Sequence, residues 1–215
     1  MKDDCLYKGV CNDDCSKSCM RYSQMKYMLD HSNLPKNQQC IHKLIPDSCD
    51  LKAFEYLQSI QLDIENFVRG GNNLYIWSRQ VGNGKTTWSI KLLLQYFDSV
   101  WDRCAYTQLG VFVNVPNYLS KCKASISNPE IDLSEIQYGL LNAPIAICDD
   151  VIVSKLSNYD YSSLESFIDS RLFEGKTTIF TGNYSPDELE SVAGPRLRSR
   201  ICSGEIVELR GKDRR

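Results

Sequence analysis

The strongest chemical signal in the sequence is a run of small and basic residues suited to binding phosphate: Gly82, Asn83, Gly84, Lys85, Thr86 and Thr87. The run follows an expected strand at 74–77 and opens an expected helix at 85–97. Glycines let successive backbone N–H groups point at a phosphate chain, and the helix N-terminus adds partial positive charge. Lys85 can reach the β- and γ-phosphates, and the Thr86 hydroxyl can ligate magnesium. The run therefore predicts a P-loop that binds ATP and Mg²⁺, against the alternative of a glycine turn that meets no ligand.

One residue departs from the full P-loop pattern. Arg79 stands where the pattern has a glycine, before the turn that leads to Gly84. Gly82 relieves the departure in part, because it opens the turn closer to the lysine. We expect Arg79 to loosen the loop or to narrow the choice of nucleotide without abolishing binding.

An acidic pair follows a second buried run, the apolar residues at 145–148. Asp149 should emerge at the end of that strand, where it can bind the magnesium ion directly or through water. Asp150 stands where many ATPases carry a glutamate that polarises the attacking water. Aspartate is one methylene shorter than glutamate. It could still act as the base, and hydrolysis would then be slower. The alternative is a surface acidic pair that merely ends a buried strand.

The elements that must hold these residues alternate along the chain. Short apolar runs predict strands at 74–77, 110–115, 143–148, 177–181 and 206–209. Helical spacing predicts helices at 20–29, 51–68, 85–97, 118–123, 133–141, 162–172 and 186–192. Strands that alternate with helices predict an α/β fold with a mostly parallel sheet and helices on both faces.

Four further segments carry a family resemblance: Thr181-Gly182-Asn183, Ile168-Asp169-Ser170-Arg171, Gly194-Pro195-Arg196-Leu197-Arg198-Ser199-Arg200-Ile201 and Gly211-Lys212-Asp213-Arg214-Arg215. With the P-loop and the acidic pair, they make the chain resemble a DnaC/DnaI-type replicative helicase loader of phage or Gram-positive type. This family is a branch of the AAA+ ATPases. The resemblance covers the chain from about residue 51 onward and extends to the N-terminus.

The resemblance implies a lidless P-loop AAA+ core that hydrolyses ATP to ADP and phosphate. Asn183 would hold the attacking water, and Arg215 would touch the phosphates of the same nucleotide. Arg200, with Arg196 as the second candidate, would be an arginine finger that acts on a neighbouring copy, since the γ-phosphoryl group needs charge compensation. The alternative for these arginines is a solvated basic helix face. The family also implies self-association through the ATP site, contact with single-stranded DNA, and a DnaB-type hexameric helicase as partner.

Four cysteines cluster near the N-terminus: Cys5, Cys11, Cys15 and Cys19. Four thiolates in a short span predict a zinc site that would stabilise a small module, and an iron–sulfur cluster has the same ligand demand. His42 could replace one thiolate. The alternative is free surface cysteines in a reducing cell. We expect a cysteine-rich module at 1–46 and the ATPase domain at 47–215, and the resemblance makes the module the helicase-binding part.

Bulk properties limit the partners. The 215 residues carry a formal net charge of −2, so any contact with nucleic acid must use a local patch or many copies lining a channel. Tyr118, Lys121 and Lys123 are candidates for stacking and phosphate contact. Neither a secretory signal nor a membrane-spanning run is apparent, so we expect a cytoplasmic protein, in the host cytoplasm if a phage encodes it.

Other functions share the P-loop. A transposition-helper AAA+ ATPase would have the same core and a different N-terminal partner domain, and the cysteine cluster favours the loader. A nucleotide kinase would need an acceptor pocket and a mobile arginine-rich lid. A fourth alternative is a switch that binds ATP and hydrolyses it slowly. Arg79 in place of a glycine and Asp150 in place of a glutamate are consistent with slow hydrolysis. The sequence leaves the rate of hydrolysis and the number of subunits open.

Overall fold

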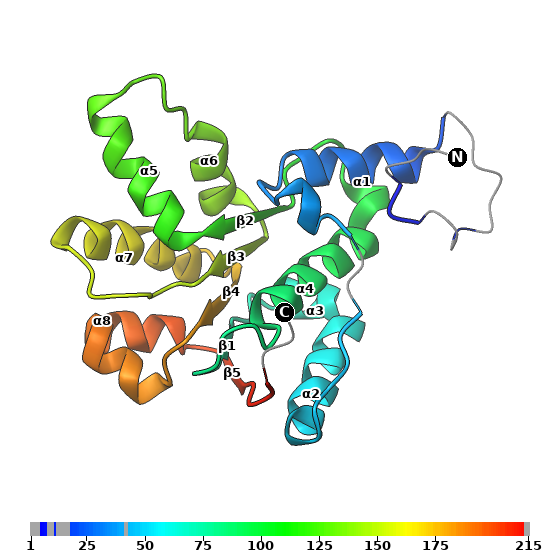
Figure 1. Cartoon of the computed structure of the whole chain (residues 1–215). Helices are drawn as coiled ribbons and strands as arrows, with labels where there is room; N and C mark the ends of the chain where they lie inside the picture. Colours follow the sequence, from blue (N-terminus) through cyan, green and yellow to red (C-terminus); the bar gives the residue numbers. More distant parts are fainter. Residues whose placement is uncertain (1–4, 8–10, 12–17, 41–42, 213–215) are drawn as a thin grey trace.

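The computed structural model describes residues 5–7, 11, 18–40 and 43–212, and its centre is a five-stranded sheet (Figure 1). The strands are β1 (Leu74–Trp77), β2 (Gly110–Asn114), β3 (Ile145–Asp149), β4 (Thr177–Gly182) and β5 (Glu205–Glu208). They lie in the order β2-β3-β4-β1-β5, and every neighbouring pair is parallel. The predicted α/β fold with a parallel sheet is therefore confirmed. Because the strands are parallel, the residues that follow their carboxyl ends meet at one edge of the sheet.

Helices cover both faces of the sheet. One face carries α1 (Met20–Asp30), α2 (Leu51–Leu62), α3 (Ile64–Arg69) and α4 (Lys85–Val100), and the other carries α5 (Val115–Ser127), α6 (Ser134–Asn142), α7 (Asn158–Phe173) and α8 (Pro186–Ile201). Alternate residues of each strand point to opposite faces. Leu74 and Ile76 of β1 therefore join the buried cluster under α2 and α4, whereas Tyr75 joins the cluster under α5–α8.

Three predicted boundaries are corrected. The single helix expected at 51–68 is two helices, because Asp63 adopts φ −115° and ψ 29° between α2 and α3. The strand expected at 110–115 ends at Asn114, whose side chain accepts the Asn117 N–H and so starts α5. The helix expected to end at 192 continues as α8 to Ile201 across a break at Gly194, which has φ 81°.

The described N-terminal residues pack on the larger part of the chain. Met25 and Met28 of α1 are buried in the same cluster as the face of α4, so these side chains belong to the core. The turn after α1 also closes the edge strand of the sheet. The Phe112 N–H donates to Ser32 O at 2.7 Å, and Asn33 Nδ2 donates to Phe112 O at 2.8 Å. The division between 1–46 and 47–215 stays a prediction, and α1 shares its core with the second part.

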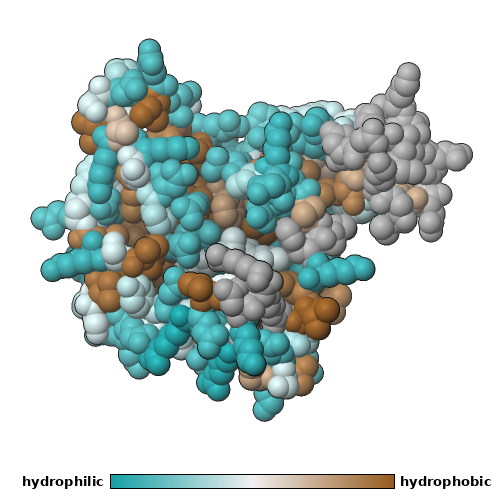
Figure 2. Space-filling view, viewed as in Figure 1, coloured by the Kyte–Doolittle hydropathy of each residue, from teal (hydrophilic) through white to brown (hydrophobic). Residues whose placement is uncertain are grey.

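The surface in the view of Figure 2 is mainly hydrophilic, and its hydrophobic residues form separate patches. Within the described ranges, every helix is too short or too polar to cross a bilayer.

Candidate nucleotide-binding site

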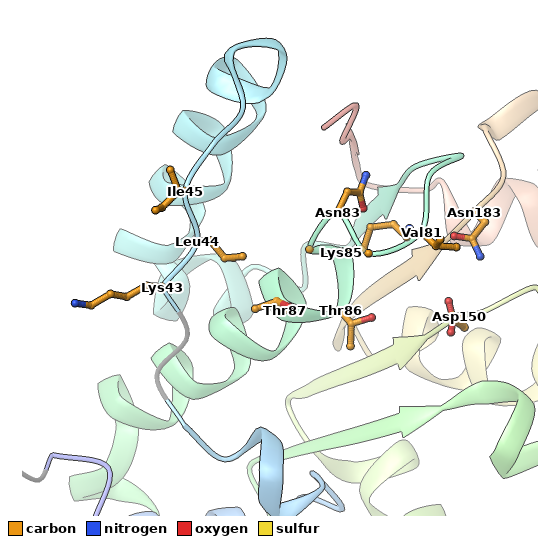
Figure 3. Close-up of a pocket in the computed structure, with 12 residues that line it drawn as sticks. Lys43, Leu44, Ile45, Val81, Asn83, Lys85, Thr86, Thr87, Asp150 and Asn183 are labelled. Carbon is orange, nitrogen blue, oxygen red and sulfur yellow. The ribbon is translucent and has the colours of Figure 1, made fainter. Parts of the chain in front are cut away.

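A pocket of about 470 Å³ opens at the carboxyl edge of the sheet. All six residues of the predicted P-loop, 82–87, line it together with Asp150 and Asn183. Val81 and the segment 43–45 complete the lining, and Figure 3 shows Lys43, Leu44 and Ile45 on one side of the P-loop with Asp150 and Asn183 on the other. The fold thus brings three predicted residues together in one pocket: Lys85 for the phosphates, Asp150 as the base and Asn183 to hold the water.

The P-loop backbone needs its glycines. Gly82 has φ 72° and Gly84 has φ 103°, a left-handed conformation that side chains with a Cβ rarely adopt. Gly84 is also the N-cap of α4, so the first N–H groups of a long buried helix face the pocket. The Lys85 Nζ donates to Gln80 O at 2.9 Å, which holds the ammonium group inside the loop. A loop of this shape suits a phosphate chain.

Asn83 supports the loop from behind. Its side chain is buried, and Nδ2 donates to Leu209 O at 3.0 Å and to the Ser78 hydroxyl. These bonds connect the P-loop to the ends of β1 and β5. The hydrogen bonds of its side-chain amide therefore fix the shape of the loop. Asn83 also belongs to the lining of the pocket.

The two predicted magnesium ligands are in direct contact. Thr86 Oγ1, at the start of α4, donates to Asp149 Oδ1 at 2.7 Å, and Asp149 ends β3 as a buried carboxylate. A hydroxyl and a carboxylate beside a phosphate-binding loop are the oxygen ligands that Mg²⁺ prefers. The residues present therefore fit a magnesium ion. Thr181 Oγ1 of β4 also donates to Asp149 Oδ1, at 2.7 Å.

Asp150 and Asn183 enter the pocket from turns that follow β3 and β4. Asp150 has φ 53°, an uncommon conformation for a residue other than glycine, and its N–H donates to Thr181 Oγ1 at 3.0 Å. Asn183 follows the last residue of β4 directly. Both side chains are half-buried and line the pocket, and their roles as a base and a water-holding amide stay predictions.

Arg79 points away from the pocket. Its guanidinium lies 2.9 Å from Glu188 Oε1, and Glu188 belongs to the capping box that begins α8. Among the described residues that line the pocket, Arg79 is absent. The side chain of Arg79, which replaces the glycine of the pattern, thus connects the P-loop to α8. The prediction that Arg79 narrows the choice of nucleotide gains no support from this position.

The two candidate finger arginines differ in their surroundings. Arg200 donates to both carboxylate oxygens of Asp169 on α7, and its side chain is 26% exposed. Arg196 is 75% exposed and lies 3.8 Å from Glu165 Oε1. Neither belongs to the described lining of its own chain's pocket. Arg215 lies outside the described residues, so the predicted contact of the C-terminal arginine stays a prediction.

The helix-end arginine of the segment at 168–171 is structural. Arg171 is fully buried, and its guanidinium donates to Thr178 Oγ1 at 2.9 Å and to the carbonyl oxygens of Leu140 and Ala143 at 2.8 and 2.9 Å. Burial lowers the pKa of Arg171 to about 10. The side chain therefore ties α7 and β4 to the connection between α6 and β3.

The cysteine cluster is described only in part. Cys5, Cys11 and Cys19 lie within the described residues, and Cys15 and His42 lie outside them. In residues 5–7, 11, 18–40 and 43–212, no group of three or more potential ligands is arranged to hold a metal ion. Cys19 instead caps α1, with its Sγ accepting the Tyr22 N–H. The described residues give the zinc prediction no support.

The candidate DNA contacts are only partly available. Lys123 forms an ion pair with Asp160 at 2.7 Å, and the half-buried Tyr118 packs against the hydrophobic cluster under α5–α8. Lys121 is exposed. A stacking role for the Tyr118 ring is therefore not supported by its surroundings.

Sequence reasoning missed two parts of the site. Lys43, Leu44 and Ile45 form a wall of the pocket, although the sequence predicts them to lie in the N-terminal module. The signal in the sequence is an apolar pair that precedes Pro46. Thr181 lies in the segment Thr181-Gly182-Asn183, in which the family resemblance implies a role for Asn183 alone. The contact between Thr181 and Asp149 depends on the pairing of β3 with β4, which the sequence did not specify.

The sheet order and the loop at its edge define a P-loop α/β protein, with the fold of AAA+ proteins. The DnaC helicase loader superposes with a TM-score of 0.63 at 21% identity, over 77% of this chain and 93% of that chain. A putative primosome component from Streptococcus pyogenes serotype M3 gives 0.62 at 21% identity, over 88% and 98%. The replication initiator DnaA bound to AMPPCP and single-stranded DNA gives 0.57 at 18% identity, over 76% and 47%. The resemblance to helicase loaders is thereby confirmed in the fold.

No protein-family model and no curated protein sequence matches the chain.

Proposed function

We propose that this chain is a magnesium-dependent ATPase that loads a DnaB-type hexameric helicase onto single-stranded DNA during replication. The observation that carries the proposal is the contact of Thr86 with Asp149 at a P-loop pocket that Asp150 and Asn183 complete. The fold supports it, because the DnaC helicase loader shares that fold. The protein would act in the cytoplasm, in the host cytoplasm if a phage encodes it.

Each residue of the pocket has a role in hydrolysis. Lys85 and the N–H groups of the loop bind the β- and γ-phosphates, and Thr86 and Asp149 hold the metal ion. Magnesium, when bound, neutralises charge that develops on the phosphate oxygens. Asp150 accepts a proton from the attacking water, and Asn183 orients that water. ADP and phosphate are the products.

The wall at 43–45 provides an apolar surface for the adenine ring of ATP. Leu44 lies against Gly84, where a Cβ would meet its Cδ2 at 3.4 Å, so this side chain reaches the loop. We assign the adenine ring to the side of the pocket that Leu44 and Ile45 form. An apolar face with few polar groups is typical of a site for a planar ring.

Charge compensation comes from a neighbouring copy. Arg200 remains the first candidate for the finger and Arg196 the second. For Arg200 to act, its bonds to Asp169 must open, whereas Arg196 is already largely exposed. An arginine that reaches the γ-phosphate only after assembly makes hydrolysis depend on the oligomer.

DNA contact would use the same edge of the sheet. A hollow of about 220 Å³ begins directly after Asp150, at Val151 and Val153, and Lys123 and Lys155 stand in its lining. Single-stranded nucleic acid suits a groove that combines apolar surface with lysines. The residues before 47 would bind the helicase, and any metal held by Cys5, Cys11, Cys15 and Cys19 would stabilise that part.

ATPase activity tests the proposal, measured with and without single-stranded DNA and a hexameric helicase. The ATPase activity of wild type should rise when both are present. Lys85→Ala should bind nucleotide at least about tenfold more weakly than wild type, and Arg200→Ala should bind ATP without hydrolysing it. Arg103→Ala is the control, because Arg103 forms an exposed ion pair with Glu65 far from the pocket. Co-purification with the helicase separates the loader from a transposition helper. Activity that ignores DNA and helicase but rises with a nucleoside monophosphate would replace the loader by a kinase.

A further inference from the structure

Thr181 lies at the centre of the acidic pair, and we propose that its hydroxyl positions both Asp149 and Asp150 for magnesium and water. The inference rests on the proposed ATPase function and adds a residue to it. Thr181 is fully buried near the end of β4. Its Oγ1 donates to Asp149 Oδ1 at 2.7 Å and accepts the Asp150 N–H at 3.0 Å. One hydroxyl group thus uses its donor on one acidic residue and a lone pair on the next.

The first effect is on the orientation of the Asp149 carboxylate. Oδ1 receives two hydroxyl donors from opposite elements, Thr86 on α4 and Thr181 on β4, each at 2.7 Å. Two donors on one oxygen fix the rotation of the carboxyl group about its terminal bond. Partners behind a metal ligand orient it and raise its affinity for the metal. Thr181 is such a partner, since it touches the ligand and does not line the pocket itself.

The second effect is on the backbone at Asp150. A left-handed conformation costs free energy for a residue with a Cβ, so surrounding contacts must hold it. Thr181 supplies two such contacts, through Oγ1 to the Asp150 N–H and through its carbonyl oxygen to the Val151 N–H at 2.9 Å. The turn that results directs the Asp150 side chain into the pocket. Thr181 is therefore a positioning residue for both acids.

Three substitutions separate the hydroxyl from the shape of the side chain. Thr181→Val keeps the volume and removes the hydroxyl, whereas Thr181→Ser keeps the hydroxyl and removes a methyl group. Thr177→Val is the matched control, because Thr177 is a buried threonine at the other end of β4 whose hydroxyl donates to Val68 O at 3.3 Å. All three are compared with wild type by titration of a fluorescent ATP analogue at a series of Mg²⁺ concentrations and in EDTA.

We expect Thr181→Val to weaken binding in Mg²⁺ by about 10- to 100-fold, the usual effect of removing a partner behind a metal ligand. Binding in EDTA should stay unchanged, because Lys85 and the loop are intact. Thr181→Ser and Thr177→Val should bind as wild type does in both conditions. A merely structural role would lower the melting temperature of the two valine variants alike without changing the Mg²⁺ dependence.

Equal Mg²⁺ dependence in Thr181→Val and Thr181→Ser would overturn the inference. If Thr181→Val loses its circular dichroism spectrum, Thr181→Ala removes the same hydroxyl without a new methyl group, and the same comparison decides. Wild type that binds no ATP analogue at any Mg²⁺ concentration would overturn the proposed function and this inference with it. Wild type that binds with Mg²⁺, beside a Thr181→Val that binds equally well, would overturn the inference alone.

Discussion

The arginines at the end of α8 show how strongly the surroundings of a residue decide its chemistry. Arg196 and Arg200 are four residues apart on a helix, so they project from the same face toward α7. Arg200 meets Asp169 and makes two hydrogen bonds, whereas Arg196 stays largely in solvent. Both contacts are partly exposed, so neither ion pair contributes much to stability. The pairs instead determine which guanidinium is exposed: that of Arg196 lies largely in solvent, and that of Arg200 is held by Asp169.

The pKa of Asp169 gives a prediction at this scale. The hydrogen bond from Arg200 is the main cause that lowers it. A lowered folded-state pKa means that the pair stabilises the fold above the ordinary aspartate pKa and that this contribution is lost as the pH falls through the lowered value. In an NMR titration we expect the Asp169 pKa to return to its ordinary range in Arg200→Ala. Arg198→Ala is the control, because Arg198 faces Glu190 instead. An Asp169 pKa that is the same in wild type and Arg200→Ala would contradict the pairing.

The sequence predicted well which side chains lie together at the P-loop, and it predicted their hydrogen-bond partners poorly. The types and spacing of Lys85, Thr86 and Asp149 are enough to place them, because phosphate and magnesium demand those groups next to a strand and a helix. Leu44 carries no such demand, since any apolar side chain could form a wall. Its place in the pocket follows from how the segment before α2 passes beside the P-loop (Figure 3).

At the scale of elements, α4 connects the phosphate site to the N-terminal residues. Its first turn carries the P-loop lysine, and further along it packs against α1, α2 and α3. Near its end, Asp98 accepts hydrogen bonds from Arg21 and Tyr7. The N-terminal segment thus contacts the same helix that begins at the P-loop.

The packing of α1 predicts a difference between two methionines of that helix. Met28 is 1% exposed and Met20 is 67% exposed. Met28→Ala should lower the free energy of unfolding by about 2–5 kcal/mol, because it leaves a cavity in the shared core. Met20→Ala, the same substitution on the same helix, should leave the free energy of unfolding nearly unchanged. Urea denaturation measures both, and equal stabilities would show that α1 is a detachable module.

Element types were predictable and element ends were not. Each predicted strand and helix overlaps an observed one, since apolar runs and helical spacing reflect burial directly. The break at Asp63 carries no glycine or proline signal. At the other boundary, Gly194-Pro195 looked like an end but lies within α8, where left-handed Gly194 lets the helix resume. α8 packs against α7, and this contact stabilises the helical turns that follow the break.

At the scale of the molecule, segments near both ends of the chain are hydrogen-bonded to each other beside the pocket. The carboxylate of Asp50 accepts the N–H groups of Arg210 and Gly211 at 2.7 and 2.9 Å, and Asp47 accepts that of Lys212 at 3.0 Å. These bonds tie the residues after β5 to the turn that follows the pocket wall at 43–45. A nucleotide bound between that wall and the P-loop would therefore stabilise both ends of the chain at once.

Hydrogen exchange can detect this linkage. With Mg²⁺ and ATP at about 100 times the dissociation constant, binding should add about 2.7 kcal/mol of stability. We expect slower exchange in the P-loop, in residues 43–50 and at Arg210 and Gly211, with little change in α6, which lies far from the pocket. Protection confined to the P-loop would contradict the role of the 43–45 wall.

The central claim is that Lys85 binds the phosphates of ATP, and isothermal titration calorimetry with ATP and Mg²⁺ tests it most directly. Lys85→Ala is compared with Lys91→Ala, which removes a lysine from the same helix that lies over the Trp88 ring and outside the pocket lining. Hydrogen bonds to charged groups contribute about 1.5–3 kcal/mol, so Lys85→Ala should bind at least about tenfold more weakly than wild type. Lys91→Ala should bind as wild type does. Equal affinities in the two variants, or no heat of binding with wild type, would contradict the account.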